Sequence, residues 1–136
     1  MAAPLRLAIT RMARRLRQEA DPGLTPSQLA ALASIERHGP LTPSDLAGLE
    51  RVSRPTATRI LRGLLDSGLI DRRPDPADGR SALVEISERG RKLLTRLRSR
   101  KNAYLSRRLD GLEPDELETL DRAAGILERL LERDRA

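Results

Sequence analysis

Hydroxyl, proline and arginine residues between positions 53 and 62 could recognise nucleic acid. At 100° per residue on a helix, Arg59 and Arg62 fall opposite the apolar residues of the same segment. Arginine can bond guanine bidentately, threonine can bond bases or phosphates, and a helix start attracts phosphate. A solvated helix face has a similar composition, so the pattern alone leaves both interpretations open. The candidates for contact with the major groove of DNA are Ser53, Arg54, Pro55, Thr56, Thr58, Arg59 and Arg62.

A second group of candidates follows in a segment rich in turn-forming residues, 75–79. Arg80 would project from the tip of this turn, and a protruding arginine can enter the narrow minor groove, where negative potential is concentrated. Asp78 would orient that guanidinium, or simply form the turn, which an Asp-Gly pair does well. We expect the minor groove to be met by Asp78, Gly79 and Arg80, and phosphates to be met by Arg72 and Arg73 at the base of the hairpin.

The elements that position these side chains have clear boundaries. Thr25 and Thr42 each precede a proline and a polar residue three positions on, which predicts capped helix starts. Ser53 is expected to cap a third helix that ends at residues 67–68, and Ser87 a long helix that runs to about Leu109. Segments 69–73 and 81–86 predict two short strands joined by the turn.

The order of these elements predicts the fold class. Two short helices followed by a hairpin is the order of a winged helix-turn-helix, whose second helix lies in the major groove. We therefore expect one domain over residues 1–136 that is mainly α with a small β-hairpin wing. Residues 24–87 would bind DNA, and the helical segments 1–20 and 88–136 would form the dimer.

The last helix carries a seam that is typical of helix pairing. It opens at Pro114, and its leucines recur with a heptad-like spacing. The residues of this seam are Leu117, Leu120, Ala124, Leu127 and Leu131.

The distribution of charge agrees with a polyanionic partner. The formal net charge of the 136 residues is +6. Residues 51–109 hold sixteen basic against six acidic side chains, whereas residues 110–136 hold four against nine. A basic middle and an acidic end indicate that a polyanion faces one region of the protein. An unevenly charged, solvated surface is the alternative, and composition does not decide between them.

The composition also argues against several classes of protein. With no cysteine and one histidine, disulfides, thiolate zinc sites and most catalytic arrangements are not available. We expect no enzymatic activity, no cofactor and no metal, since neither a phosphate-binding glycine loop nor a metal-ligand cluster is present. No apolar stretch is long enough to span a membrane.

The first residues are basic and amphipathic, which superficially resembles a transit peptide. Their apolar residues have helical spacing, and no cleavage-like region follows, so we favour a packed helix in a cytoplasmic protein. These residues are Leu5, Ile9, Met12 and Leu16.

The chain resembles the multiple-antibiotic-resistance regulator (MarR) family over nearly its whole length. The resemblance rests on the ordered segments 52–59, 66–72, 75–80 and 87–90. The family's wing pattern of two aspartates and an arginine falls on Asp75, Asp78 and Arg80. The resemblance implies a homodimer whose first and last helices intertwine, using Leu5, Ile9, Met12, Leu16 and the 117–131 seam.

The resemblance also implies regulation by a small molecule in some members. Such proteins often bind small anionic aromatic compounds or sense oxidants, and the absence of cysteine argues against the second kind. A pocket among the first, second and fifth helices would draw on Arg14, Arg15, His38 and Tyr104. The alternatives are a surface turn residue for His38 and a dimer or core residue for Tyr104.

We therefore expect a sequence-specific regulator of transcription that binds double-stranded DNA at an inverted-repeat operator as a homodimer. The resemblance implies that the regulator represses transcription. The competing interpretation is a winged helix that binds protein or RNA, because fold alone does not fix function. The basic face centred on Arg59, together with Arg80, favours DNA.

Overall fold

The computed structural model describes residues 1–77, 79 and 82–134. Within them lie six helices and a two-stranded antiparallel sheet, which confirms the expected fold class. The elements are α1 (Ala2–Glu19), α2 (Pro26–His38), α3 (Pro43–Glu50), α4 (Arg54–Asp66), β1 (Ile70–Pro74), β2 (Ala82–Ile86), α5 (Glu88–Leu109) and α6 (Pro114–Arg133).

The predicted helix starts are confirmed because their signals are local. The Thr25 side chain accepts a hydrogen bond from the Gln28 N–H, and the Gln28 side chain accepts one from the Thr25 N–H. Thr42 and Asp45 form the same reciprocal pair at the start of α3. Each pair satisfies two backbone donors that have no partner inside the helix.

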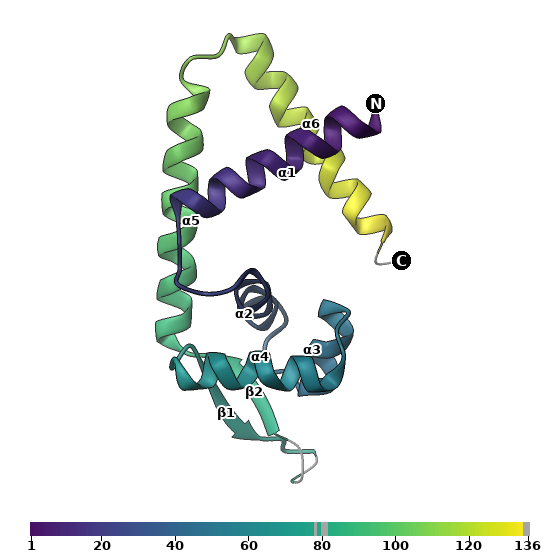
Figure 1. Ribbon diagram of the computed structural model, residues 1–136, viewed down its shortest axis with the longest axis vertical. Coiled ribbons are helices and arrows are strands. Elements are labelled where there is room, and N and C mark those ends of the chain that lie inside the picture. The colour runs from purple at the N-terminus through teal and green to yellow at the C-terminus, as the bar shows by residue number, and fades with distance from the viewer. Residues whose placement is uncertain (78, 80–81, 135–136) are drawn as a thin grey trace.

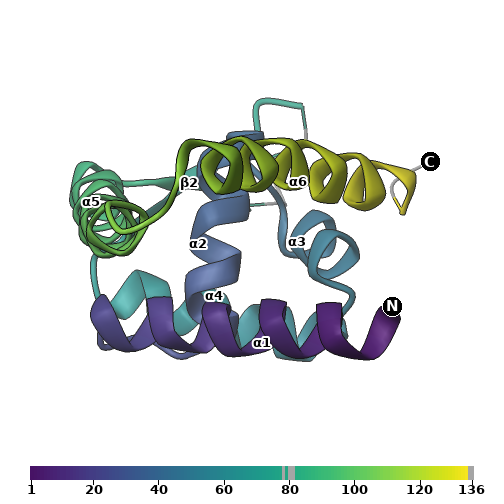
Figure 2. The same cartoon turned by 90° about the horizontal axis from the view of Figure 1, so that it is seen from above.

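The helices divide into a head and two arms. The head consists of α2, α3, α4 and the β1–β2 hairpin, and the arms are α1 and α6. Figure 1 shows α5 as a long upright helix that connects the head to the turn before α6. Both arms extend from α5 toward the same side, and Figure 2 shows them separated when the molecule is seen from above.

The hairpin is joined to the head by a third extended segment. β1 and β2 pair from Ile70↔Ile86 to Pro74↔Ala82. Leu41, between α2 and α3, bridges to Val84 through two backbone hydrogen bonds of 2.8 and 2.9 Å. A two-stranded hairpin is only marginally stable alone, so this bridge fixes the wing to the helices.

The hydrophobic core lies in the head and along one side of α5. Its largest fully buried side chains come from all the helices of the head and from β1: Leu32, Ile35, Leu46, Leu64 and Ile70. On α5 the buried leucines are Leu93, Leu94 and Leu97. The arms, in contrast, contribute no buried residue.

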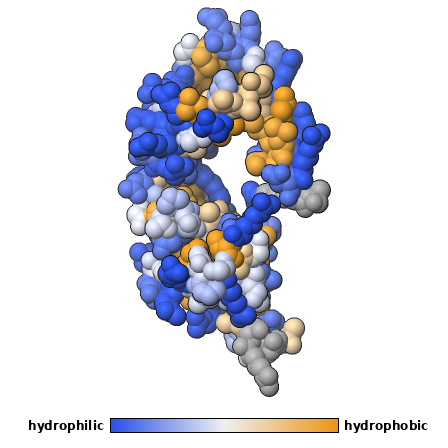
Figure 3. Space-filling model, turned by 45° about the vertical axis from the view of Figure 1, so that its right-hand side comes forward, coloured by the Kyte–Doolittle hydropathy of each residue, from blue (hydrophilic) through white to orange (hydrophobic). Residues whose placement is uncertain are grey.

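The predicted first helix forms, and its C-terminal end packs within the chain. That end lies against α5, where Leu16 is half-buried. Leu5, Ile9 and Met12 remain exposed. Figure 3 shows apolar side chains gathered over the upper region of the molecule, where the arms lie.

None of the helices in the described residues combines the length and apolar character needed to cross a bilayer.

Candidate nucleic-acid interface

The N-terminus of α4 is built by local hydrogen bonding. The Ser53 hydroxyl accepts a hydrogen bond from the Thr56 N–H at 3.3 Å and donates one to the Thr56 hydroxyl at 2.9 Å. Pro55 lies in the first turn, where its missing N–H costs nothing. The first turn of α4 is therefore held in place with its polar groups near solvent.

The two sides of α4 have opposite chemistry. Ala57, Leu61 and Leu64 are buried in the head, as the helical spacing predicts. The other side forms one surface depression lined by Arg54, Pro55, Thr58, Arg59 and Arg62. Among the described residues, none of these three arginines forms an ion pair. The structure thus gathers five of the seven major-groove candidates into one surface, with Ser53 and Thr56 at its N-terminal edge.

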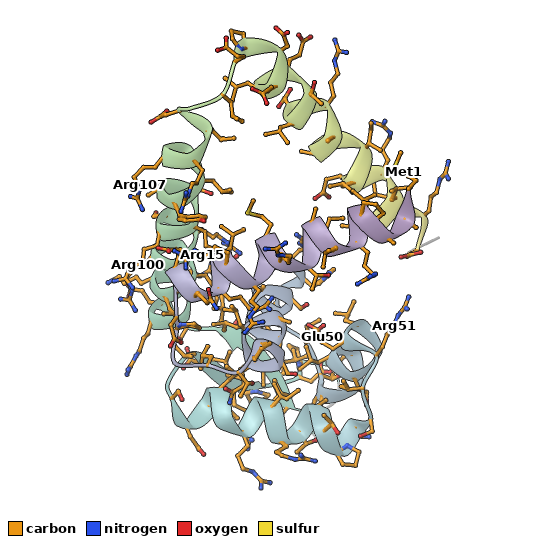
Figure 4. All side chains as sticks on the ribbon, turned by 45° about the horizontal axis from the view of Figure 1, so that its top comes forward. Met1, Arg15, Glu50, Arg51, Arg100 and Arg107 are labelled. Carbon is orange, nitrogen blue, oxygen red and sulfur yellow. The ribbon has the colours of Figure 1, made fainter. Side chains whose placement is uncertain are left out.

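A short turn sets the angle between α3 and α4. Arg51 ends α3 in the left-handed conformation, with φ of 54°, and the next N–H, from Val52, bonds the Ala47 carbonyl. Glycine is the usual residue at such a position because it has no side chain to crowd the backbone. Figure 4 shows the Arg51 side chain directed outward from this turn.

The wing places Arg72 and Arg73 on opposite faces of the hairpin, because successive side chains of a strand alternate. Arg72 pairs in register with Val84, whereas Arg73 forms a 3.4 Å ion pair with Glu85. The two phosphate candidates therefore do not share one surface.

The turn of the wing is only partly described. Asp75 accepts a 2.9 Å hydrogen bond from the Ala77 N–H, which accounts for that aspartate structurally. Gly79 lies exposed in the turn, while Asp78 and Arg80 lie outside the described residues.

Ser87 ties together the end of α4, the wing and the start of α5. Its hydroxyl accepts a 3.1 Å hydrogen bond from the Gly90 N–H and donates a 2.7 Å bond to the Gly68 carbonyl. Gly90 approaches so closely that an added Cβ would clash with the Leu69 carbonyl oxygen. Sequence reasoning identified Ser87 only as a cap, although the Ser-x-x-Gly spacing carries a signal for this close approach.

Two of the four effector candidates meet at the contact between α1 and α5. Arg15 Nε donates a 3.3 Å hydrogen bond to the Tyr104 hydroxyl, and the guanidiniums of Arg15 and Arg108 lie 5.4 and 5.3 Å from the centre of its ring. The hydrogen bond from Arg15 lowers the pKa of Tyr104 below its ordinary value, against the opposing effect of burial. Arg15 also pairs with Glu19 at 2.7 Å. Tyr104 thus joins the N-terminal arm to α5.

The other two effector candidates lie elsewhere. Arg14 lines a depression between the end of α1 and the start of α2, together with Arg17, Leu24 and Leu29. His38 is exposed at the end of α2 and lines a different depression, which also includes residues of α3 and α5. The structure does not bring the four into one pocket.

The dimerisation candidates lie on the arms. Those exposed are Leu5, Ile9, Met12, Leu117, Leu120 and Leu131, and those half-buried are Leu16 and Leu127. α1 and α6 therefore each present an apolar side that their own chain leaves largely uncovered.

Two short helices, a three-residue turn between them and an antiparallel hairpin define a winged helix-turn-helix protein of the DNA-binding kind. Residues 24–82 match the profile of the MarR family. An uncharacterised HTH-type transcriptional regulator of Mycobacterium leprae is 38% identical over 133 residues, covering 97% of this chain and 93% of the relative.

Solved structures agree with this assignment. A putative transcriptional regulator of Pseudomonas aeruginosa superposes with a TM-score of 0.86 at 37% identity, over 96% of this chain and 92% of that one. The apo form of wild-type MarR from Escherichia coli gives a TM-score of 0.74 at 25% identity, over 96% of both chains. This chain belongs to the MarR family of winged helix-turn-helix transcription regulators, a family of DNA-binding proteins and not of enzymes.

Proposed function

We propose that the protein acts as a homodimer that binds an inverted-repeat operator and represses transcription by excluding polymerase from the DNA it covers. The proposal rests mainly on the chemistry of the outward side of α4. Three exposed arginines without ion-pair partners among the described residues lie there beside hydroxyl groups. Unpaired arginine on a helix that begins at a surface is suited to both guanine edges and phosphates.

The roles within α4 follow from position. Ser53 and Thr56 lie at the helix start, where backbone N–H groups and hydroxyls meet a phosphate. Arg54 lies in the first turn, while Thr58, Arg59 and Arg62 extend along the exposed side. We assign sequence reading mainly to Arg59, because it lies mid-helix between the other two arginines.

The arms support the dimeric state in this proposal. Exposed leucine, isoleucine and methionine on both arms are costly in water, and a second copy would cover them. Two-fold symmetry would then present two α4 helices to successive turns of the major groove, about 34 Å apart. The two-fold symmetry is the reason to expect an inverted repeat, and the distance of about 34 Å predicts the spacing of its half-sites, roughly one helical turn.

The wing completes the proposed contact. We assign Asp78, Gly79 and Arg80 to the minor groove that flanks each α4, as in the sequence-based hypothesis. Arg72 is the stronger phosphate candidate of the basal pair, because the Arg73 guanidinium already has Glu85 as a partner.

We also propose that a small anionic aromatic compound acts as an effector that regulates operator binding. The depression at Arg14 combines Arg14 and Arg17 with leucine and proline side chains, and two cations against the single Asp21 carboxylate suit a carboxylate on an aromatic ring. It lies where α1 leads into α2, so an occupant would alter how the arm and the head are joined. Salicylate and benzoate are suitable probes, and release of labelled operator by either compound would support this role. If neither compound changes operator affinity at concentrations where direct binding is saturated, the effector role is wrong.

Selection of bound duplexes from a random pool tests the proposal directly. We expect an inverted repeat whose half-sites are separated by about one helical turn. Arg59→Ala is expected to relax the selected sequence. The matched control is Arg129→Ala, which removes the same charge from the exposed side of α6 and is expected to leave the selected sequence unchanged. Recovery of no enriched sequence, or of a single unrepeated site, would contradict the proposal.

A further inference from the structure

The outward side of α5 carries a line of arginines that the interface described above does not use. The helix contains nine basic residues and one acidic residue among its 22. Spacings of seven, four and seven residues place Arg89, Arg96, Arg100 and Arg107 within about 40° of one another around the helix axis. All four side chains are exposed.

Arg96, Arg100 and Arg107, the three arginines of the stripe farther from the head, form no ion pair within the described residues. On α5 the ion pairs join Lys92 to Glu88, which line one depression with Arg89 and Arg96, and Arg98 to Glu36 on another side of the helix. Arg108 instead lies over the ring of Tyr104. The α5 stripe, defined as Arg96, Arg100 and Arg107 with Arg89 at its foot, therefore presents positive charge to solvent.

The foot of the stripe, at Arg89, lies near the C-terminal end of α4. The Arg89 Nη1 atom lies 3.8 Å from the position that a Cβ would take on Gly68, directly after α4. Higher up, Figure 4 shows Arg100 and Arg107 directed away from α1 and α6. A partner that covers the arms would leave this flank uncovered. From Arg89 to Arg107 the stripe rises about 27 Å along the helix axis, at about 1.5 Å per residue.

We propose that the α5 stripe binds the phosphates of DNA flanking the operator, so that the duplex bends along α5 on both outer sides of the dimer. The inference rests on the proposed function, because it takes the operator to lie against α4. DNA leaving the operator is the polyanion nearest to the foot of the stripe. A rise of about 27 Å corresponds to about eight base pairs at 3.4 Å each. Contacts to the backbone alone would make this binding independent of flank sequence and sensitive to salt.

Duplex length separates flank binding from operator binding. One probe is a duplex of about 24 base pairs that carries the selected inverted repeat, and the other adds about 15 base pairs of arbitrary sequence on each side, roughly twice the length of the stripe. With six upper arginines per dimer, we expect the long duplex to bind the wild type about tenfold more tightly at low salt. Its salt dependence is expected to be steeper by up to about 5 in the log–log slope. Energy transfer between dyes on the ends of the long duplex is expected to rise on binding.

The test variant is Arg96→Gln, Arg100→Gln and Arg107→Gln combined, with Arg89 retained because its guanidinium lies beside Gly68, just beyond α4. We expect its advantage for the long duplex to fall below about twofold, while its affinity for the short duplex stays within about twofold of the wild type. The matched control also removes three positive charges, but from the exposed side of α6. It is expected to bind the long duplex more tightly than the short one, as the wild type does. Its substitutions are Arg122→Gln, Arg129→Gln and Arg133→Gln.

The remaining outcomes overturn the inference. A wild type that binds both duplexes equally shows that the flank does not contact DNA. Equal loss in both triple variants shows a general effect of net charge. A further outcome is that the α5 variant still binds the long duplex more tightly than the short one, while sedimentation without DNA shows that it has lost assemblies larger than a dimer that the wild type and the α6 control form. In that case the stripe binds the acidic α6 of another copy and not DNA. Failure of the proposed function is distinct, because the wild type would then not bind the short duplex, and this inference would fall with it.

Discussion

Truncation of two leucines on α6 is expected to separate the dimer without damaging the subunit. The variant is Leu120→Ala combined with Leu131→Ala. Neither side chain belongs to the core, because α6 contributes no buried residue within its own chain. The substitution therefore acts on association and leaves the packing of the head intact.

The magnitude follows from the exposed fractions. Leu120 is 49% exposed and Leu131 is 56% exposed, so together they leave about one whole leucine side chain per subunit uncovered. Burial of one leucine stabilises by about 2 kcal/mol, which gives about 4 kcal/mol for the two subunits of a dimer. Since about 1.4 kcal/mol is a factor of ten, the dissociation constant of the dimer is expected to rise about 1,000-fold.

Sedimentation equilibrium over a wide range of protein concentration measures this constant, and far-ultraviolet circular dichroism checks that the helices persist. Leu49→Ala is the matched control, because Leu49 is 44% exposed but lies on α3 in the head. The reasoning is refuted if the α6 variant dimerises like the wild type, or if the control weakens the dimer equally.

Three further predictions concern the head and its attachment. Arg59→Ala is expected to weaken operator binding by about 1–3 kcal/mol per subunit and to flatten the ranking of operator variants in competition assays; a reduced salt slope with an unchanged ranking would make Arg59 a phosphate contact only. Ser87→Ala is expected to lower the free energy of unfolding by about 2 kcal/mol in urea titrations at fixed protein concentration, because it removes a helix cap and a bond to a carbonyl at the end of α4. The exposed cap Thr25→Ala is expected to cost about half as much, and equal losses would show that the second bond contributes nothing. The Arg15 hydrogen bond lowers the pKa of Tyr104 in the folded state, so the folded protein binds fewer protons than the unfolded protein as the pH rises toward 10, and the free energy of unfolding of the wild type is expected to increase relative to that of Tyr104→Phe as the pH rises. Tyrosinate absorbance from the single tyrosine measures this pKa directly, and a value at or above that of an unfolded peptide would contradict the hydrogen bond from Arg15.

The helix starts could be predicted because capping is decided within four residues. Thr25 with Gln28 and Thr42 with Asp45 form the expected reciprocal bonds. The two sides of α4 were predicted for the same reason, since helical periodicity alone places Ala57 and Leu61 opposite Arg59. The wing strands also fall where expected, within one residue, because turn-forming residues separate them.

Other features could not be predicted because they join segments that are distant in the chain. No local signal indicated that Leu41 would bridge to Val84, or that the Arg73 guanidinium would meet Glu85. The effector candidates were grouped by analogy, yet the structure places His38 and Arg14 in different depressions.

Local sequence signals specify which segments become helix or strand and which side of each is apolar, because caps, turns and periodicity act over a few residues. Which apolar sides are then buried within the chain depends on the three-dimensional arrangement of the elements. The head covers its own, through Leu32, Leu46 and Leu64, whereas the arms leave theirs in water. The physical reason is that burial depends on how elements meet in space. As Figure 1 shows, α5 is long enough to carry most of both arms away from the head, so Leu5, Leu120 and Leu131 are not covered by a surface of the same chain.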